Sequence, residues 1–225
     1  MLARGGATGF IPPDNRSLVA TSLACLALLV AFLALADGLT RGYRLWTFES
    51  LRRDDAAAGR IKAPSILLAG PQGTTPTPWP GPPGEIYIVD FVYTRCPTVC
   101  AALGAEYTRM QALLDKRFGA HSPVRLVSIA FDRPHDTPAA LAHYASDHRQ
   151  NPALWLLGIP QSAAAQEDLL RTLGIVAIPD GLGGFTHNGA IHLIDAQGTV
   201  RAIHDLDQWP RALDQALAMS KGGHP

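Results

Sequence analysis

Two cysteines separated by three residues offer the clearest chemistry in this sequence. Cys96 and Cys100 follow directly on residues 85–94 (EIYIVDFVYT), a run of β-branched and aromatic residues that predicts a buried strand. If a helix begins at this point, the two side chains share one face, because positions i and i+4 of a helix are neighbours. The positive end of the helix dipole also stabilises a thiolate, the form that binds soft metals and attacks disulfides. The pair is therefore predicted to be a metal site or a redox-active dithiol.

The spacing of the pair favours a metal, because the usual dithiol-exchange motif has one residue fewer between its cysteines. Cu(I) and Cu(II) both accept thiolate and imidazole ligands, so a histidine is expected to complete the site. The chain has eight histidines. By position alone His187, which follows a glycine-rich turn and precedes a predicted strand, is an ordinary surface histidine. His192 is five residues further on, a separation that in a strand places it on the opposite face from His187. Surface positions on charged helices are expected for His121, His143 and His148.

The elements that must position these residues alternate between strands and helices. After the strand at 85–94, the pattern predicts helices at 101–118, 136–148, 162–173 and 209–219, and strands at 124–131, 154–157, 189–195 and 199–203. Asp136, Thr137 and Pro138 are a helix start signal, and residues 195–198 (DAQG) are typical of a hairpin turn. This order predicts an α/β fold with a mostly parallel central sheet flanked by helices, as a thioredoxin-like domain requires.

A long apolar segment precedes this pattern. Residues 18–36 contain no charged side chain, and at about 1.5 Å per residue they just cross a hydrocarbon core of about 30 Å. We therefore expect one N-terminal transmembrane helix at 18–36, an anchor or uncleaved signal, after a short cytoplasmic N-terminus at 1–17. The alternative is a cleaved signal peptide, because Ala34-Leu35-Ala36 resembles a small-residue cleavage site. Cys25, within this run, is expected to be a packing residue.

Residues 37–84 are predicted to be a juxtamembrane segment that leads into a domain at 85–220. Within it, residues 43–58 place apolar and charged side chains at roughly helical spacing, which is typical of a short helix. Residues 70–84 hold six prolines and four glycines, so they are predicted to be a loop without regular structure.

Three blocks of the sequence resemble the Sco/SenC family. They are residues 93–100 (YTRCPTVC), Val127-Ser128-Ile129 with Asp132 and the start signal at Asp136, and His187 leading into Leu193-Ile194-Asp195 and Gly198. The resemblance extends from about residue 86 to the carboxyl terminus. Members of this family are membrane-anchored, thioredoxin-fold copper proteins that assist assembly of the dinuclear copper centre of cytochrome c oxidase. The resemblance implies that Cys96, Cys100 and His187 bind copper as Cu(I), Cu(II) or both.

The function implied by this resemblance is that of a copper chaperone. Its partner would be a copper-accepting oxidase subunit or another periplasmic copper or thiol protein. The alternative is a membrane-anchored thiol–disulfide oxidoreductase, which uses both cysteines but has no need of His187, so enzyme activity stays open. A peroxidase on the same fold would depend on a single cysteine. Charge is balanced, with 19 basic and 19 acidic residues, so no nucleic-acid partner is expected.

The distribution of arginines and the copper chemistry indicate opposite orientations in the membrane. Arginines follow the apolar segment more densely than they precede it, and a simple count of them would leave the domain in the cytoplasm. Large domains translocate largely regardless of such charge, and the copper chemistry favours the outside. We therefore expect a single-pass protein of the inner membrane with its C-terminal domain in the periplasm.

Overall fold

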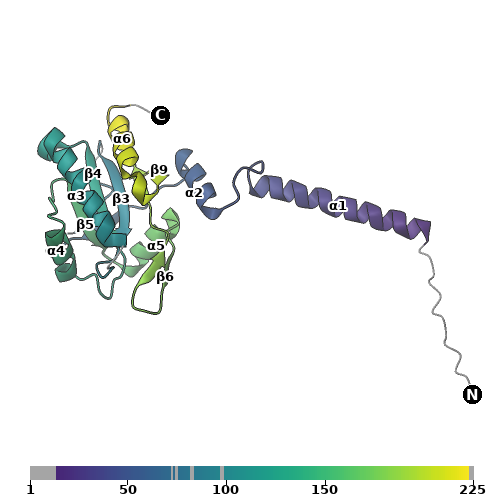
Figure 1. Ribbon diagram of the computed structural model, residues 1–225, viewed down its shortest axis with the longest axis horizontal. Coiled ribbons are helices and arrows are strands. Elements are labelled where there is room, and N and C mark those ends of the chain that lie inside the picture. The colour runs from purple at the N-terminus through teal and green to yellow at the C-terminus, as the bar shows by residue number, and fades with distance from the viewer. Residues whose placement is uncertain (1–13, 72, 74–75, 82–83, 97–98, 223–225) are drawn as a thin grey trace, which may run out of the picture. The chain divides into compact units, whose positions relative to one another are not determined.

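The computed structural model describes residues 14–222 apart from 72, 74–75, 82–83 and 97–98, with only the backbone of 99–102 (Figure 1). The chain divides into two compact units, Met1–Leu51 and Arg52–Pro225. Each unit is described by itself.

The first unit is built on α1 (Asn15–Leu39), which contains the whole of the predicted anchor at 18–36. Asp14 caps its amino end by accepting a hydrogen bond from the Arg16 amide. No residue of α1 is buried, and by length and composition the helix is able to cross a membrane. Residues 1–13 of the predicted cytoplasmic segment lie outside the described part of the chain.

Three parallel strands form the centre of the sheet in the second unit, as predicted. β3 (Ile86–Val92) pairs with β4 (Val124–Ala130), and β4 pairs with β5 (Trp155–Pro160). Every residue of β3 is buried, as expected of a parallel strand covered on both faces. On its other side β3 pairs antiparallel with β8 (Ile191–Ile194), which forms the predicted hairpin with β9 (Val200–His204).

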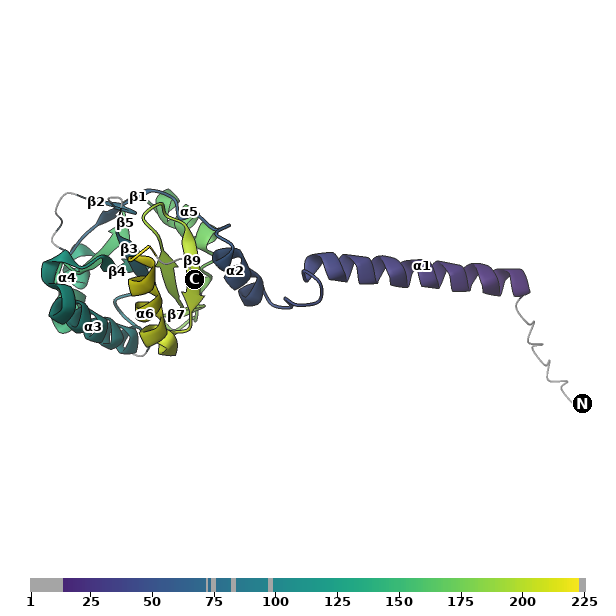
Figure 2. The same ribbon diagram turned by 90° about the horizontal axis from the view of Figure 1, so that it is seen from above.

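Helices cover both faces of this sheet. α3 (Val99–Phe118), α4 (Pro138–Asp147) and α6 (Trp209–Met219) lie on one face, and α5 (Ala163–Leu173) lies on the other (Figure 2). The crossovers β3–α3–β4 and β4–α4–β5 step across the sheet in the same direction. Because such crossovers are right-handed, α3 and α4 must share a face.

Local sequence signals form the expected contacts at the ends of these elements. Thr137 caps α4, its Oγ1 accepting from the Ala140 amide at 3.2 Å. Asp195 Oδ1 accepts from the amides of Gln197 and Thr199, at 3.0 and 2.9 Å, in the turn between β8 and β9. Short 3-10 helices lie at Gly119–His121 and Leu206–Gln208.

Two short strands extend the sheet beyond β5. β1 (Ile66–Ala69) pairs with β5, and β2 (Thr77–Trp79) pairs with β1, both antiparallel. The prediction that this proline-rich segment has no regular structure is therefore wrong for β2. Pro78 fits this strand because β2 is the outermost of the sheet, where one side of the backbone needs no donor. The buried Trp79 side chain packs the strand onto the core.

A separate hairpin and a short helix complete the described elements. β6 (Ala177–Pro179) pairs antiparallel with β7 (Phe185–His187), and this two-stranded sheet, which the sequence pattern did not predict, lies between α5 and β8 in the chain. α2 (Phe48–Ala57) agrees with the short helix predicted within 43–58, and Arg52 and Ala56 are its buried residues.

Candidate metal centre

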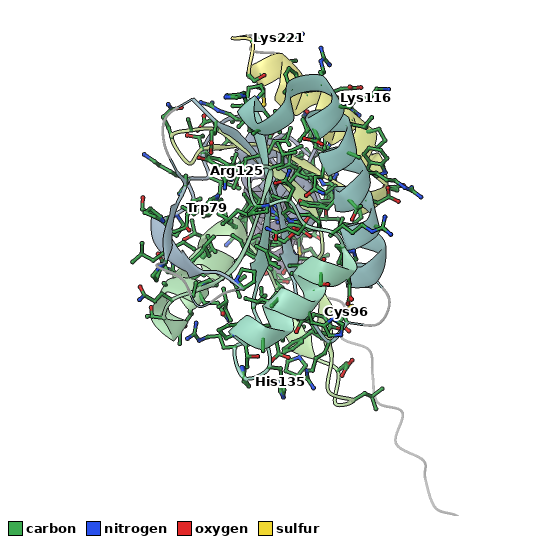
Figure 3. All side chains as sticks on the ribbon, turned by 90° about the vertical axis from the view of Figure 1, so that its left-hand side faces the viewer. Trp79, Cys96, Lys116, Arg125, His135 and Lys221 are labelled. Atoms are coloured by element: carbon green, nitrogen blue, oxygen red, sulfur yellow. The ribbon has the colours of Figure 1, made fainter. Side chains whose placement is uncertain are left out.

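Cys96 lies in a tight turn after β3. The strand ends at Val92, and the Cys96 amide donates to the Tyr93 carbonyl at 3.1 Å. The Cys96 side chain is half-buried against the core. Figure 3 shows Cys96 and His135 at the same end of the domain. This is the edge at which the parallel strands β3 and β4 end, the usual place for a functional site in such a sheet.

Cys100 is the second residue of α3, at the helix end where the dipole favours a thiolate. The backbone thus agrees with the prediction that a helix begins at the cysteine pair. Pro97, Thr98 and the side chain of Cys100 lie outside the part of the chain that the structure describes. Convergence of the two sulfurs therefore stays a prediction.

His187 closes β7, and its imidazole packs in a cluster with Tyr93, Phe131 and Phe185. Its ring centroid lies 5.4 Å from that of Phe131 and 6.4 Å from that of Tyr93. A Cβ added to Gly189 would lie 3.1 Å from His187 Cε1. Nδ1 is buried and finds no hydrogen-bond partner among the described residues, and burial lowers the pKa of the imidazole. The ring is therefore neutral at neutral pH, the form in which histidine binds a metal.

Tyr93 connects the turn of Cys96 with the hairpin of His187. Its carbonyl accepts the Cys96 amide, its ring packs against Phe185 at 5.3 Å, and its hydroxyl accepts from the Phe185 amide at 3.4 Å. The turn and the hairpin therefore meet at one aromatic cluster. The structure brings two of the three predicted ligands to the same end of the domain.

Two buried aspartates, Asp132 and Asp136, fix the loops around Cys96. Asp136 Oδ1 accepts from Thr94 N at 2.8 Å and Thr94 Oγ1 at 2.7 Å, and its Oδ2 accepts from the Asp132 amide at 2.7 Å. Asp132 pairs with the Arg95 guanidinium at 2.9 Å and with His135 Nδ1 at 3.0 Å. Burial alone would raise the pKa of Asp132, but hydrogen bonds from His135 and Arg95 bring it below its ordinary value. Sequence reasoning used Asp132 as a motif position and Asp136 as part of a motif and of a helix start signal, and it missed this supporting role.

Two other histidines are held by partners away from this cluster. His192 is fully buried, and its Nε2 accepts from Arg52 Nη1 at 3.0 Å. Burial, and secondarily the charge of Arg52, lower the pKa of His192 to about 3. His204 Nε2 lies 2.9 Å from Gln215 Oε1. Neither histidine is available to the predicted site.

His148 corrects the prediction that it lies on a charged helical surface. It follows the last residue of α4, and its ring packs on Tyr144 with 4.4 Å between the centroids. A Cβ added to Gly104 of α3 would lie 2.4 Å from this ring. Burial lowers the pKa of His148. The end of α4 packs against α3, and the periodicity of α4 alone did not reveal this contact.

Asp90, in the middle of β3, is a buried carboxylate that sequence reasoning did not single out. It is fully buried, and its carboxylate oxygens have no hydrogen-bond partner among the described residues. Burial raises the pKa of Asp90 to about 7, against the opposing effect of the nearby Ser128 and Tyr107 hydroxyls. An acidic residue within an otherwise apolar strand was the signal available in the sequence.

The described side chains contain no group of three or more His, Cys, Asp or Glu placed to hold a metal. The predicted set includes Cys100, whose side chain lies outside the described part of the protein, so this statement does not extend to it. The chemistry of His187 fits a copper site, because its buried Nδ1 has no partner in the described part of the protein.

Comparison with known proteins places these features in a family context. A sequence model of the SCO1/SenC family matches residues 79–220. The SCO1 protein homolog of Bacillus subtilis (strain 168) is 29% identical to this chain over 119 residues, which are 52% of this chain and 60% of that protein. The chain thus spans 60% of the length of this relative.

Solved structures share the fold. BsSco, whose structure identified a disulfide switch in a member of the Sco family of cytochrome c oxidase assembly proteins, is 18% identical. It has a TM-score of 0.61, over 72% of this chain and 94% of that chain. ScoI of Bradyrhizobium japonicum, solved with copper bound, is 22% identical with a TM-score of 0.54, over 71% and 98% of the two chains. At these identities the likeness establishes the thioredoxin-like fold.

Proposed function

Because the chain belongs to the SCO1/SenC family, we propose that it is a copper-binding protein that assists assembly of the copper centre of cytochrome c oxidase. The family match covers residues 79–220, which hold all the predicted ligands. Copper is the cargo in this proposal. The domain takes it up and passes it to a copper-accepting oxidase subunit or to another copper or thiol protein.

Cys96, Cys100 and His187 are the proposed ligands. The observation that carries this proposal is the half-buried, neutral imidazole of His187, whose buried Nδ1 no described residue satisfies, although buried polar atoms are nearly always paired. Tyr93 holds the Cys96 turn against the same aromatic cluster. Two thiolates and one imidazole suit both Cu(I) and Cu(II).

Copper titration of the reduced protein tests the ligand set. We expect a single copper ion per chain, and a large loss of affinity in Cys96→Ser, Cys100→Ser and His187→Ala. His135→Ala is the matched control, because His135 lies at the same end of the domain but pairs with Asp132. Unchanged stoichiometry and affinity in all three ligand variants would end the proposal.

The proposed location is the inner membrane, with α1 as a single span and the second unit in the periplasm. Its support is the length and apolar composition of α1, none of whose residues is buried. Digestion of the domain by protease added to spheroplasts is the expected result, and protection would contradict this orientation. Sequencing the amino terminus of the mature protein tests the alternative of a cleaved signal peptide.

A thiol–disulfide oxidoreductase is the second candidate function. The position of Cys100 in the first turn of α3 favours it, because a helix amino terminus lowers the pKa of a thiol. The two functions differ in their need for His187. Rapid turnover of a disulfide substrate by His187→Ala without copper would support the oxidoreductase, whereas absence of turnover together with tight copper binding by the unmodified chain would support the copper carrier.

A further inference from the structure

The exposed aromatic side chains that follow α1 are confined to one short segment. Tyr43, Trp46 and Phe48 are 42%, 68% and 61% exposed. Every other Phe, Tyr and Trp in the described part of the chain after α1 is buried or half-buried. Large apolar surfaces left open on a protein mark places where a partner or a membrane binds. A cluster of three directly after a long apolar helix therefore requires an explanation.

This segment is a hydrogen-bonded turn. Thr40 Oγ1 donates to the Ala36 carbonyl at 2.6 Å and accepts from the Tyr43 amide at 2.9 Å. The Tyr43 hydroxyl donates to the Leu33 carbonyl at 2.6 Å, so the ring folds back along the last turns of α1. Trp46 Nε1 donates to the Tyr43 carbonyl at 2.9 Å, and the two rings lie 6.0 Å apart. The aromatic side chains are thus held at a defined level relative to the end of α1.

The position of the turn along the chain points to a lipid surface. Residues 17–36 carry no charge, and as a helix they are about 30 Å long, the thickness of a hydrocarbon core. The turn that follows therefore falls at the level of the phospholipid headgroups when α1 spans a bilayer. Arg41 and Arg44, both exposed, lie in this turn, where they are able to meet lipid phosphates.

We infer that residues 40–48 form an interfacial anchor, in which Tyr43, Trp46 and Phe48 lie in the headgroup region beside Arg41 and Arg44. The inference rests on the proposed anchoring by α1. Tyr and Trp favour this region because each has an apolar ring and a polar atom that stays hydrated or hydrogen-bonded. The interfacial anchor fixes the depth of α1 and the point at which the chain leaves the membrane.

Depth-dependent fluorescence quenching of Trp46 tests the interfacial anchor in the full chain reconstituted into phosphatidylcholine vesicles. The difference in emission between the unmodified chain and Trp46→Phe isolates Trp46, because the other three tryptophans, Trp79, Trp155 and Trp209, lie in the second unit and contribute to both. We expect this difference emission to be shifted to the blue relative to water. Quenching of this difference emission should be strongest with lipids brominated near the headgroup, at every protein-to-lipid ratio.

A matched control is Leu113→Trp in the Trp46→Phe background, because Leu113 is 49% exposed on α3 of the second unit. The emission that this substitution adds to that of Trp46→Phe should resemble that of tryptophan in water, and brominated lipids should not quench it. If Trp46 behaves like this control while the protein stays with the vesicles, the interfacial anchor is overturned and anchoring by α1 stands. The interfacial anchor is also overturned if quenching is strongest with lipids brominated near the ends of their acyl chains. A blue shift that depends on protein concentration and is not accompanied by quenching overturns it as well. Release of the chain from the vesicles by carbonate overturns both proposals.

Discussion

Burial keeps the imidazole of His187 neutral, and the glycine beside it leaves the ring room. Gly189→Ala would place a Cβ 3.1 Å from His187 Cε1, closer than an ordinary van der Waals contact, so the ring must shift. We expect the copper affinity to fall about tenfold, or about 1.4 kcal/mol, in competition with a chelator. Gly70→Ala is the control, because its Cβ would make an ordinary contact, 3.7 Å from the Leu157 carbonyl. Equal affinities in both variants would show that the position of the ring does not limit binding.

Asp90 is expected to make the stability of the domain depend on pH. Because burial raises its pKa from 3.8 to about 7, the folded chain keeps a proton there that the unfolded chain has lost at intermediate pH. The contribution of Asp90 to the free energy of unfolding should therefore decrease as the pH rises from about 4 to about 7, by up to about 4 kcal/mol, and add no further slope above that range. The buried His192, whose pKa is lowered to about 3, contributes a slope of the opposite sign over much of this range. Asp90→Asn, which cannot ionise, should remove this contribution, so its free energy of unfolding relative to the unmodified chain should rise across this range in urea unfolding experiments.

Asp132→Asn provides the control for this measurement. The pKa of Asp132 is lowered, so its carboxylate contributes stability above the unfolded pKa of 3.8, and this contribution is lost only as the pH falls through the lower folded value. The variant should therefore keep the slope between about pH 4 and pH 7 while losing stability uniformly across it. An equal pH dependence in Asp90→Asn and in the unmodified chain would show that Asp90 does not contribute to it.

The residues of the site were not equally accessible to sequence reasoning. The spacing of Cys96 and Cys100 after a strand was enough to select the pair. His187 was selected by family resemblance, since its burial depends on packing against Phe131, far away in the chain. The raised pKa of Asp90 likewise depends on how deeply β3 is covered, which the sequence of that strand does not specify.

The loop before α4 places a site-supporting residue and a helix cap side by side. Asp136 accepts hydrogen bonds from Thr94 and Asp132 in the loops around Cys96, whereas Thr137 caps α4. Asp136→Ala leaves these donors without their acceptor, which should cost about 1–3 kcal/mol of stability and speed alkylation of Cys96. Thr137→Ala should cost about 1 kcal/mol and leave Cys96 unaffected.

Peptide mass spectrometry after timed alkylation measures this difference and separates Cys96 from the other cysteines. Urea unfolding of the same two variants measures the cost in stability. If both variants alkylate at the same rate, Asp136 supports the fold but not the turn of Cys96.

The elements that sequence reasoning predicted are those with strong internal patterns. β3, β4 and the helices have apolar runs or periodic faces, and their bounds differ little from the predicted ranges. The strands β1, β2, β6 and β7 are only three or four residues long, which is too short to show a period. β1 and β2 form because the distant strand β5 offers an edge with which β1 pairs. β7 places His187 against Tyr93 and Phe131, the residues that directly follow β3 and β4. Pairing of this kind depends on the assembled sheet.

In the whole molecule, the second compact unit begins within α2, well before the family match at residue 79. Arg52 of α2 is 4% exposed, and its guanidinium donates to His192 Nε2 at 3.0 Å and to the Leu173 carbonyl at 3.1 Å. Ala56, one turn further, is fully buried. Residues 52–57 of α2 are therefore an integral part of the domain, although they lie close to the anchor in sequence.

Two soluble fragments, 48–225 and 59–225, test this contribution. The shorter fragment loses Arg52 and Ala56, leaving the buried Nε2 of His192 without its donor, so we expect it to be less stable by about 2–4 kcal/mol in urea unfolding. Arg52→Met in the longer fragment should lose part of this amount, because it removes the hydrogen bonds but keeps the helix. Both fragments retain Cys96, Cys100 and His187 and should bind copper with equal stoichiometry. Equal stability of the two fragments would mean that α2 packs on the domain without supporting it, and that the fold needs only the sheet and the helices that follow it.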